Sequence, residues 1–449
     1  MTVDETPELN DRTADHFDPD DRHPPTAPTG GVHISSELKE FSPEHHGASR
    51  ADYREAFATP GMAWPIVASL LARLPIAMGS ISILFYIQRT TDTFASAGFV
   101  AGGELLGLAA GSVIQGKLID RFGPTRTLGS VLVIFLGLAV ALFAAIEAHA
   151  PLAALIGIAF LFGSAQPALP PASRGLWGRM LPPGRVREAA YTYEAISLET
   201  FFILGPALAG ILATSAWAGL GLAVTVILFT VGTVAFITSP LVRAWRPTRV
   251  TSGAGSEPAR QLIRQPGMQT MLLLVFGFGV VIGFAEVAIP AAATKAGHPA
   301  LGGILLGAWS ITSVIFGIFY AAKPWPKALH IRGPVLLAGF TVMVGLIGFT
   351  EGLIWLTVVL MISGMLSTPQ ATLHSLLVDR VAPDRLSGEA FAWVTTAVTI
   401  GIGLGQAISG QLVESLGYQS AFLVAVVPGV AAAGWAWLRR DTLTRERNR

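Results

Sequence analysis

Residues 131–146 read VLVIFLGLAVALFAAI, a run in which every residue is apolar or glycine. The run has none of the alternation between polar and apolar residues that is typical of a lipid-facing strand, and it predicts a helix that crosses a membrane. A crossing helix needs about 20 residues, because each residue adds about 1.5 Å across a hydrocarbon core of about 30 Å. Residues 222–237 form a second, almost continuously apolar run.

Similar segments recur along most of the chain. The 449 residues are 52% hydrophobic and only 13% charged, which is far from the composition of soluble domains. The sequence therefore predicts an all-α membrane protein of twelve transmembrane helices in two six-helix halves. The predicted spans are residues 64–88, 95–116, 127–147, 152–173, 189–215, 217–240, 268–294, 300–322, 333–350, 352–377, 389–413 and 418–438.

Polar segments divide this array of spans. Five regions are predicted: a disordered N-terminal tail at 1–60, a six-helix half at 61–240, a linker at 241–267, a second half at 268–438, and a C-terminal tail at 439–449. The linker, the C-terminal tail and the other loops on the same side hold 22 Lys and Arg, whereas the opposite loops hold two. Basic residues concentrate on the cytoplasmic side. We therefore expect a multi-pass protein of the cell membrane with both termini in the cytoplasm.

An internal repeat supports the division into two halves. Positions 200 residues apart match in the fifth and eleventh spans and in the loops before them, without a gap. This register favours duplication over coincidence. The matching pairs are Pro183/Pro383, Arg185/Arg385, Ala190/Ala390, Gly205/Gly405, Ala207/Ala407 and Gly210/Gly410.

Several classes of protein are disfavoured by what the chain lacks. It has no cysteine, which excludes disulfides and thiolate metal sites, and no Walker A pattern for ATP. No cluster of acids and histidines has metal-ligand spacing, and no hydrolase motif occurs, so we expect no enzyme, metal or cofactor. A net charge of +1 gives no reason to expect a nucleic-acid partner. The expected partners are a small-molecule solute, protons and the lipid bilayer, and the expected state is a monomer.

The loop between the second and third spans has the most specific pattern in the chain. Residues 116–126 read GKLIDRFGPTR. Gly116 and Gly123 allow a tight turn and a close approach of helices. The loop resembles the G-x-L-x-D-R-x-G-x-x-R motif of the major facilitator superfamily, and the resemblance implies the fold of that family.

The same loop is expected to act as a gate. Asp120 offers a carboxylate to a neighbouring helix N-terminus, where the helix dipole is positive, and Arg121 and Arg126 can supply compensating charges. The resemblance implies that the partner is the start of the eleventh span, near residues 387–389. Such a latch would close the cytoplasmic side when the two halves meet.

Small residues mark two further helix faces. Residues 205–210 of the fifth span read GPALAG and resemble in part the GPxxGG element of drug and proton antiporters in this superfamily, through Gly205, Pro206 and Gly210. Tight helix packing is the alternative interpretation. A second face of small residues, expected to serve packing alone, lies in the second span at Gly103, Gly107 and Gly111.

Two charged residues fall near the middle of predicted spans. Arg73 and Glu104 each lie about ten residues into their spans, from opposite sides of the membrane. A charge at this depth costs a few kcal/mol or more, so we expect it to be paired or functional. Either the two residues pair within the N-terminal half, or Arg73 binds an anionic group of the solute while Glu104 tunes it. A purely structural ion pair is the alternative.

Three further acids are candidates for proton coupling: Glu199 of the fifth span, Glu286 of the seventh, and Glu194, which is expected near the cytoplasmic interface. Burial favours the neutral form of a carboxyl group, which lets it bind and release protons. The resemblance further implies that the first, fourth, seventh and tenth spans line a central cavity. The residues that would face the solute are Arg73, Gln166, Glu286, Gln370 and His374.

Three functions remain open at this point. The first is a secondary transporter that works by alternating access, with proton-coupled export of a small amphiphilic or drug-like compound. The second is uptake of a small, anionic metabolite, for which Arg73 would be the anchor. The third is a membrane sensor or assembly protein of transporter fold that moves no solute. The arginine that antiporters of this superfamily carry in the fourth span is absent, which weakens a mechanism copied from them.

Overall fold

The computed structural model describes residues 50–182, 184–245, 262–322, 328–382 and 387–444. A few side chains within helices, including those of Asp120 and Glu199, lie outside the description. The described residues form helices and connecting turns and contain no strand.

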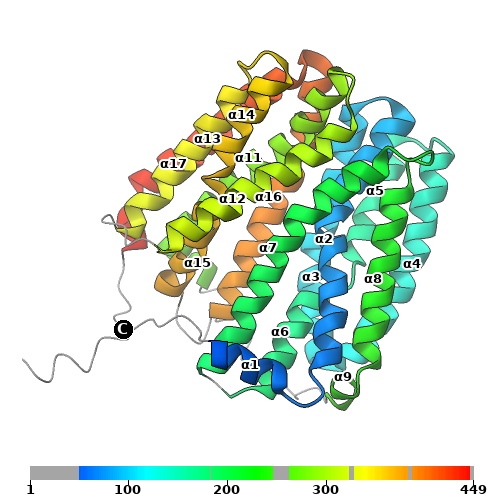
Figure 1. The fold of residues 1–449 in the computed structure, drawn as a ribbon, viewed down its shortest axis with the longest axis vertical. Helices are drawn as coiled ribbons and strands as arrows, with labels where there is room; N and C mark the ends of the chain where they lie inside the picture. Colours follow the sequence, from blue (N-terminus) through cyan, green and yellow to red (C-terminus); the bar gives the residue numbers. More distant parts are fainter. Residues whose placement is uncertain (1–49, 183, 246–261, 323–327, 383–386, 445–449) are drawn as a thin grey trace, which may run out of the picture. The chain divides into compact units, whose positions relative to one another are not determined.

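The N-terminal half consists of helices that alternate in direction across the bundle (Figure 1). Their bounds are α1 Arg50–Ala58, α2 Ala63–Thr91, α3 Phe94–Phe122, α4 Pro124–Glu147, α5 Leu152–Ser164, α6 Leu169–Met180, α7 Arg185–Ala213, α8 Leu220–Thr238 and α9 Pro240–Ala244. We call the end of the bundle where α9 lies and α11 begins the linker end, and the other end the far end.

The C-terminal half repeats this order. Its bounds are α11 Pro266–Lys295, α12 Ala300–Ala322, α13 Leu329–Ile347, α14 Gly352–Gly364, α15 Ser367–Val381, α16 Ser387–Leu416, α17 Tyr418–Leu438 and the short 3-10 helix η3 Arg440–Leu443.

The twelve predicted spans are confirmed. Eleven helical segments among the described residues are long and apolar enough to cross a membrane. The twelfth span is α7, which has 29 residues. Only its end, Leu204–Ala213, stands out as apolar, because its first half carries charged residues.

Two spans are broken rather than continuous. The fourth divides into α5 and α6, and the tenth into α14 and α15. At the first break Pro167, Pro170 and Pro171 follow one another closely, and a proline has no N–H to donate to the preceding turn. The break exposes backbone groups of residues 165–168, which then need partners from other helices.

The two halves have equivalent internal contacts. In the N-terminal half α2 packs against α7 and α8, and α3 packs against α5. In the C-terminal half α11 packs against α16 and α17, and α12 packs against α14. This correspondence follows the predicted internal repeat.

Glycines allow α3 and α5 to touch along their backbones. A β-carbon at Gly107 would overlap the carbonyl oxygen of Phe160, and one at Gly111 would overlap that of Ser164. A β-carbon at Gly103 would lie 3.2 Å from the side chain of Ile156. The packing role predicted for these three glycines is confirmed.

The halves join through α3 with α16 and through α7 with α12 (Figure 1). A β-carbon at Gly98 of α3 would lie 3.1 Å from the α-carbon of Gly410, and one at Gly210 of α7 would lie 2.5 Å from that of Gly303. All four glycines lie toward the far end of their helices. Near the linker end of α3, a β-carbon at Gly116 would have no atom within 4 Å.

Helix α1 lies inside the segment predicted to be a disordered tail. Ala56 is fully buried, and the Phe57 ring makes edge contacts with Trp177 of α6 at 6.5 Å and with Tyr193 of α7 at 4.8 Å. These partners are more than 100 residues away along the chain, so the local polar composition did not reveal the helix.

Candidate functional site

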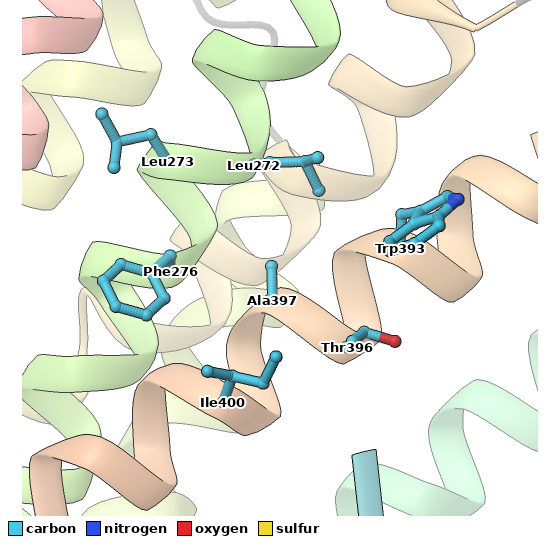
Figure 2. A pocket seen from close by; sticks show the side chains of 7 residues that line it. All are labelled: Leu272, Leu273, Phe276, Trp393, Thr396, Ala397 and Ile400. Carbon is cyan, nitrogen blue, oxygen red and sulfur yellow. The ribbon is translucent and has the colours of Figure 1, made fainter. Parts of the chain in front are cut away.

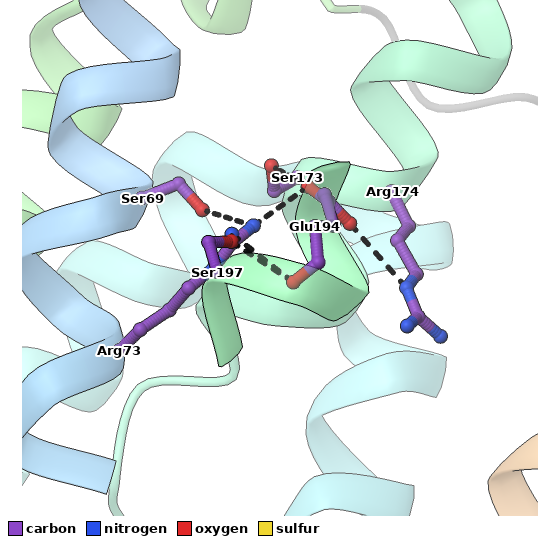
Figure 3. Close-up of polar contacts among 6 residues, drawn as sticks. All are labelled: Ser69, Arg73, Ser173, Arg174, Glu194 and Ser197. Atoms are coloured by element: carbon purple, nitrogen blue, oxygen red, sulfur yellow. Dashed lines mark hydrogen bonds and ion pairs between the residues drawn. The ribbon is translucent and has the colours of Figure 1, made fainter. Parts of the chain in front are cut away.

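The first polar cluster lies within the N-terminal half, around Arg73 of α2 (Figure 3). A guanidinium nitrogen of Arg73 lies 3.1 Å from Oε1 of Glu194 in α7, and both side chains are 3% exposed. The guanidinium also donates hydrogen bonds to Ser197 Oγ, to the carbonyl oxygen of Glu194 at 3.3 Å and to Ser69 Oγ at 3.3 Å. Arg73 therefore has one carboxylate and three further oxygen acceptors.

Glu194 is held from a second side as well. Ser173 of α6 donates a hydrogen bond to its Oε1, and Nε of Arg174 lies 3.3 Å from its Oε2. The Arg174 side chain is 49% exposed, so solvent screens this second ion pair. The ring of Tyr193 lies 5.9 Å from the Arg73 guanidinium. The cluster thus balances its buried charge inside one half.

The expected pair between Arg73 and Glu104 is wrong, because Arg73 pairs with Glu194. Arg73 lies about 15 Å along α2 from the linker end, and Glu194 lies about 14 Å along α7 from the same end. Helix α3 runs the other way and has 29 residues, so Glu104 lies about 27 Å from its linker end. The two residues therefore differ in depth by about 12 Å.

Glu104 instead has an amide partner. Its side chain is 1% exposed and accepts a hydrogen bond from Gln166, which lies at the break between α5 and α6. Its second oxygen has no hydrogen-bond partner in the described part of the chain. Gln115 of α3 donates to the carbonyl oxygen of Gln166 at 2.7 Å and accepts from the Ala168 N–H at 2.9 Å. The broken span is thus positioned by α3.

Glu286 of α11 also has an amide partner, and this one bridges the halves. Nε2 of Gln406 in α16 donates a hydrogen bond to Glu286 Oε2 at 2.8 Å. The same amide contacts the hydroxyl of Ser80 in α2 through both its nitrogen, at 2.8 Å, and its oxygen, at 3.0 Å. Oε1 of Glu104 lies 3.7 Å from the β-carbon position of Gly79 in α2, the residue before Ser80. The two acids are therefore linked to neighbouring residues of α2, Glu104 at Gly79 and Glu286 through Gln406 at Ser80.

Gln370 and His374 lie within the C-terminal half, on α15. Nε2 of Gln370 and Nε2 of His374 are 2.9 Å apart, and both side chains are buried. Oε1 of Gln370 has no hydrogen-bond partner among the described atoms. The imidazole makes an edge contact with the Phe278 ring at 5.4 Å. This pair lies in an aromatic core, apart from Glu104 and Glu286.

The loop of the gate motif forms the turn between α3 and α4. Gly123 has a positive φ of 83° and donates its N–H to the carbonyl oxygen of Ile119 at 2.8 Å, which ends α3. Arg121 and Arg126 are exposed, and the Arg121 guanidinium lies 5.0 Å from the Phe122 ring. The side chains of Asp120 and of its expected partners at 387–388 lie outside the description.

The GPALAG stretch lies where α7 contacts two other helices. A β-carbon at Gly205 would lie 2.6 Å from the β-carbon of Ala77 in α2. Gly210 faces Gly303 of α12, and a β-carbon at Gly303 would lie 2.6 Å from the carbonyl oxygen of Pro206. The stretch therefore packs α7 within its own half at one end and against the other half at the other end.

An apolar cavity of about 310 Å³ opens between α11 and α16, toward the linker end (Figure 2). Phe276 and the indole of Trp393 face it from the two helices. Helix α17 packs against both α11 and α16 and so covers one side of this helix pair. The residues that line the cavity are Leu272, Leu273, Phe276, Trp393, Thr396, Ala397 and Ile400.

Comparison with protein families gives a match over almost the whole described chain. The sequence model of the Major Facilitator Superfamily matches residues 66–386 and 330–449. The chain belongs to the major facilitator superfamily. A comparison with curated protein sequences finds no match.

Solved structures of transporters share this superfamily fold. A bacterial homologue of the human lysosomal transporter Spinster, in an inward-facing and occupied conformation, is 16% identical, with a TM-score of 0.63 over 87% of this chain and 97% of that one. The nucleoside transporter NupG is 14% identical, with a TM-score of 0.63 over 85% and 99%. A peptide transporter POT in complex with alafosfalin is 13% identical, with a TM-score of 0.64 over 86% and 96%.

Within this superfamily fold, two residues of the polar clusters, Gln406 and Ser80, stand out only in the structure. Gln406 and Ser80 are neutral, and neutral polar residues are common in membrane helices. One signal for Gln406 exists, because it lies 200 residues after Pro206 and so replaces a proline in the repeat. Glu194 was placed near the interface from sequence, but its side chain is 3% exposed. No group of three acids or histidines that could hold a metal occurs in the described chain.

Proposed function

We propose that this protein is a secondary transporter that exports a small amphiphilic solute in exchange for protons, by alternating access of its two halves. The observation that carries the proposal is the position of Glu104 and Glu286. One acid comes from each half, the two are linked to neighbouring residues of α2 at Gly79 and Ser80, and their hydrogen-bond partners are the amides of Gln166 and Gln406.

A carboxyl group with an amide partner can change its charge without breaking a salt bridge. Among the described residues neither Glu104 nor Glu286 forms an ion pair. Burial favours the neutral form, and an amide can hydrogen-bond to both forms of the acid. Movement of the halves would expose the pair to one side of the membrane and then to the other, so that protons could be taken up and released.

The apolar cavity between α11 and α16 favours an amphiphilic solute. Its lining is apolar and includes two aromatic rings, Phe276 and Trp393, while the hydroxyl of Thr396 donates a hydrogen bond to the Ala392 carbonyl oxygen of its own helix at 2.9 Å. Ile400 is the last lining residue along α16, and Gln406 lies about 9 Å further along the same helix. A solute with an apolar body and a polar or cationic head could therefore contact the cavity and the acids together.

The direction of transport and the topology rest on the sequence. The excess of basic residues at the linker end favours a cytoplasmic position for both termini. In that orientation the halves meet on the outer side, and the apolar cavity lies toward the cytoplasm. Export is favoured by the resemblance of the GPALAG stretch to the antiporter element.

Uptake of an anion through Arg73 is the weaker candidate. The Arg73 guanidinium is already occupied by Glu194, Ser197 and Ser69, so an anion would have to displace a buried carboxylate. Such displacement is costly, because it leaves the buried carboxylate without its partner. A sensor without transport remains as the alternative that a flux measurement can exclude.

The test is flux of an aromatic cation, ethidium, in liposomes that contain the purified protein. We expect an imposed proton gradient to drive ethidium movement, and the variant Glu286→Gln to lose driven movement while retaining exchange of labelled for unlabelled ethidium. Glu55→Gln, at an exposed position on α1, is the matched control. Gradient-driven movement that persists in both Glu286→Gln and Glu104→Gln would falsify proton coupling through these acids.

The direction is tested in cells. Cells that produce the protein should accumulate less ethidium than cells that produce the Glu286→Gln variant, and the difference should vanish when the proton gradient is collapsed. Higher accumulation in the producing cells would instead establish uptake. Lack of movement across a broad panel of solutes would favour the sensor alternative.

A further inference from the structure

Among the described residues, the side chains of Glu414 and Gln406 form hydrogen bonds that join the halves in the far-end part of their contact. Glu414 of α16 accepts a hydrogen bond from the Phe94 N–H, at the start of α3, at 3.0 Å. Gln406, two turns earlier on α16, contacts Ser80 of α2 and Glu286 of α11 with one amide group. The Glu414 contact is confined to the rim of the contact between the halves. The Gln406 contact reaches further and connects the contact between the halves to a buried acid, Glu286.

The strength of the Gln406 bridge depends on the charge of Glu286. An ionised carboxylate accepts the amide N–H in a charge-assisted hydrogen bond, which is about twice as strong as a neutral one. This bond holds the amide so that its oxygen and its second N–H remain for the hydroxyl of Ser80. A neutral Glu286 forms only a weak hydrogen bond in this orientation, or donates its O–H to the amide oxygen after the amide turns over.

The backbone of Gln406 lies in the contact between the halves, so a change in the strength of its side-chain bridge affects that contact. A β-carbon at Gly98 of α3 would overlap the carbonyl oxygen of Gln406, so α3 and α16 touch at this residue. Gly283 of α11 faces the Gln406 backbone nitrogen at 2.9 Å from its β-carbon position. Gln406 is therefore in direct contact with α2, α3 and α11 at once.

We propose that Gln406 is the positioning residue through which the charge of Glu286 holds the two halves together at the far end. This inference rests on the proposed function, in which Glu286 exchanges protons. An ionised Glu286 tightens the Glu286–Gln406–Ser80 bridge and keeps the far end closed. Neutralisation, by a proton or by the cationic head of a solute, loosens the bridge and lets the far end open.

Such a bridge lets a proton and a cation act on the same contact. An empty carrier with an ionised Glu286 rests closed at the far end. Binding of either a proton or a cation neutralises Glu286 and favours opening, so the two compete for one carboxylate.

The other titratable groups around Glu286 have different partners or lie at helix ends, so we assign this role to Glu286. Glu104 of α3 has Gln166 as its hydrogen-bond partner, and its Oε1 lies 3.7 Å from the β-carbon position of Gly79, the residue before Ser80. On α16, Glu414 lies two turns past Gln406 and caps α3, and on α15, His374 bonds Gln370. Ionisable side chains on α12, α13 and α17 lie at the ends of those helices, at Tyr320, His330, Arg332 and Tyr418.

The experiment measures the distance between the halves at the far end. The chain has no cysteine, so spin labels can be placed at Ala148→Cys, after α4, and at Glu351→Cys, before α14, both of which are exposed positions. In the otherwise unchanged full chain, we expect the distance distribution to shift to longer values as the pH falls. Gln406→Leu should abolish the shift and favour the longer distances at every pH, as should Ser80→Ala.

Conservative variants separate a positioning role from a merely structural one. Ser80→Thr keeps the hydroxyl and should keep the pH-dependent shift, whereas Glu286→Gln should show the longer distances at every pH. If Gln406→Leu is poorly folded, Ser80→Ala and Ser80→Thr carry the test, since they change only the far anchor of the bridge.

The two proposals fail in different ways. A pH-dependent shift that survives in Gln406→Leu and Ser80→Ala, while Glu286→Gln still abolishes driven flux, overturns the role of Gln406 and leaves the proposed function standing. A shift and a driven flux that both survive in Glu286→Gln overturn proton coupling through Glu286 itself.

Discussion

The interior of the N-terminal half and the boundary between the halves hold buried charge in different ways. Inside the half, Arg73 and Glu194 neutralise each other and are surrounded by hydroxyl groups. Glu104, and Glu286 at the boundary, have one amide partner each. In the proposed alternating-access cycle, contacts inside a half persist, whereas contacts at the boundary must break and form again.

Glycine contacts show the same division. Along α3, one glycine face packs on α5 inside the half, and Gly98 with Gly102 packs on α16 across the boundary. Inside the half the contact continues to Gly111, while across the boundary it is confined to the far end. In α3 the glycines that contact α5 lie in the middle of the helix, at residues 103–111, and those that contact α16 lie nearer the far end, at residues 98 and 102. Three sets of substitutions test this division.

The largest effect is expected from Arg73→Leu. Removal of one partner leaves Glu194 buried with only the half-exposed Arg174 nearby, and breaking a buried pair costs about 3–5 kcal/mol. Thermal unfolding in detergent should show a marked loss of stability, and Arg174→Ala, the control, should lose less than about 1 kcal/mol. The double variant Arg73→Leu with Glu194→Leu should recover much of the loss. Equal losses of stability for Arg73→Leu and Arg174→Ala would contradict the interpretation that this cluster is a lasting contact inside the half.

A smaller effect is expected from Gly107→Ala. The added methyl group would overlap the Phe160 carbonyl oxygen, and overpacking of this kind costs about 1–3 kcal/mol. The matched control is Gly116→Ala on the same helix, where a β-carbon meets nothing within 4 Å. That control should be neutral or stabilising by up to about 1 kcal/mol, because alanine favours a helix over glycine. The same unfolding measurement compares the two variants, and equal losses would mean that α3 and α5 are not held by this contact.

The smallest effect on stability is expected at the boundary itself. Gly210→Ala and Gly410→Ala would place a methyl group against the other half, and separation of the far ends relieves the overlap without unfolding either half. The unfolding temperature should change little, while the distances between labels at Ala148→Cys and Glu351→Cys should lengthen. Each 1.4 kcal/mol of overlap corresponds to about a tenfold change in the closed population. A loss of stability as large as that of Gly107→Ala would show that the halves do not separate here.

The sequence by itself determined the number and order of the membrane-crossing helices. That information is local, because a span must be long and apolar wherever the rest of the chain lies. The sequence repeat between positions 205–210 and 405–410 is also present in the structure, since Gly205 and Gly405 contact equivalent helices, α2 and α11. The depth of Arg73 could be estimated only approximately from its position in the predicted span, because the length of each helix beyond the membrane was not known.

Only the tertiary structure decided which polar groups meet. The partner of Arg73 depends on the direction that its side chain takes around α2 and on the offset between helices of 29 residues, neither of which is visible in composition. The bridge through Gln406 depends on three helices from both halves that approach one another at one point. A membrane-spanning helix forms because its own apolar residues lie in lipid, whereas a hydrogen-bonded bridge forms only between residues that the fold brings together.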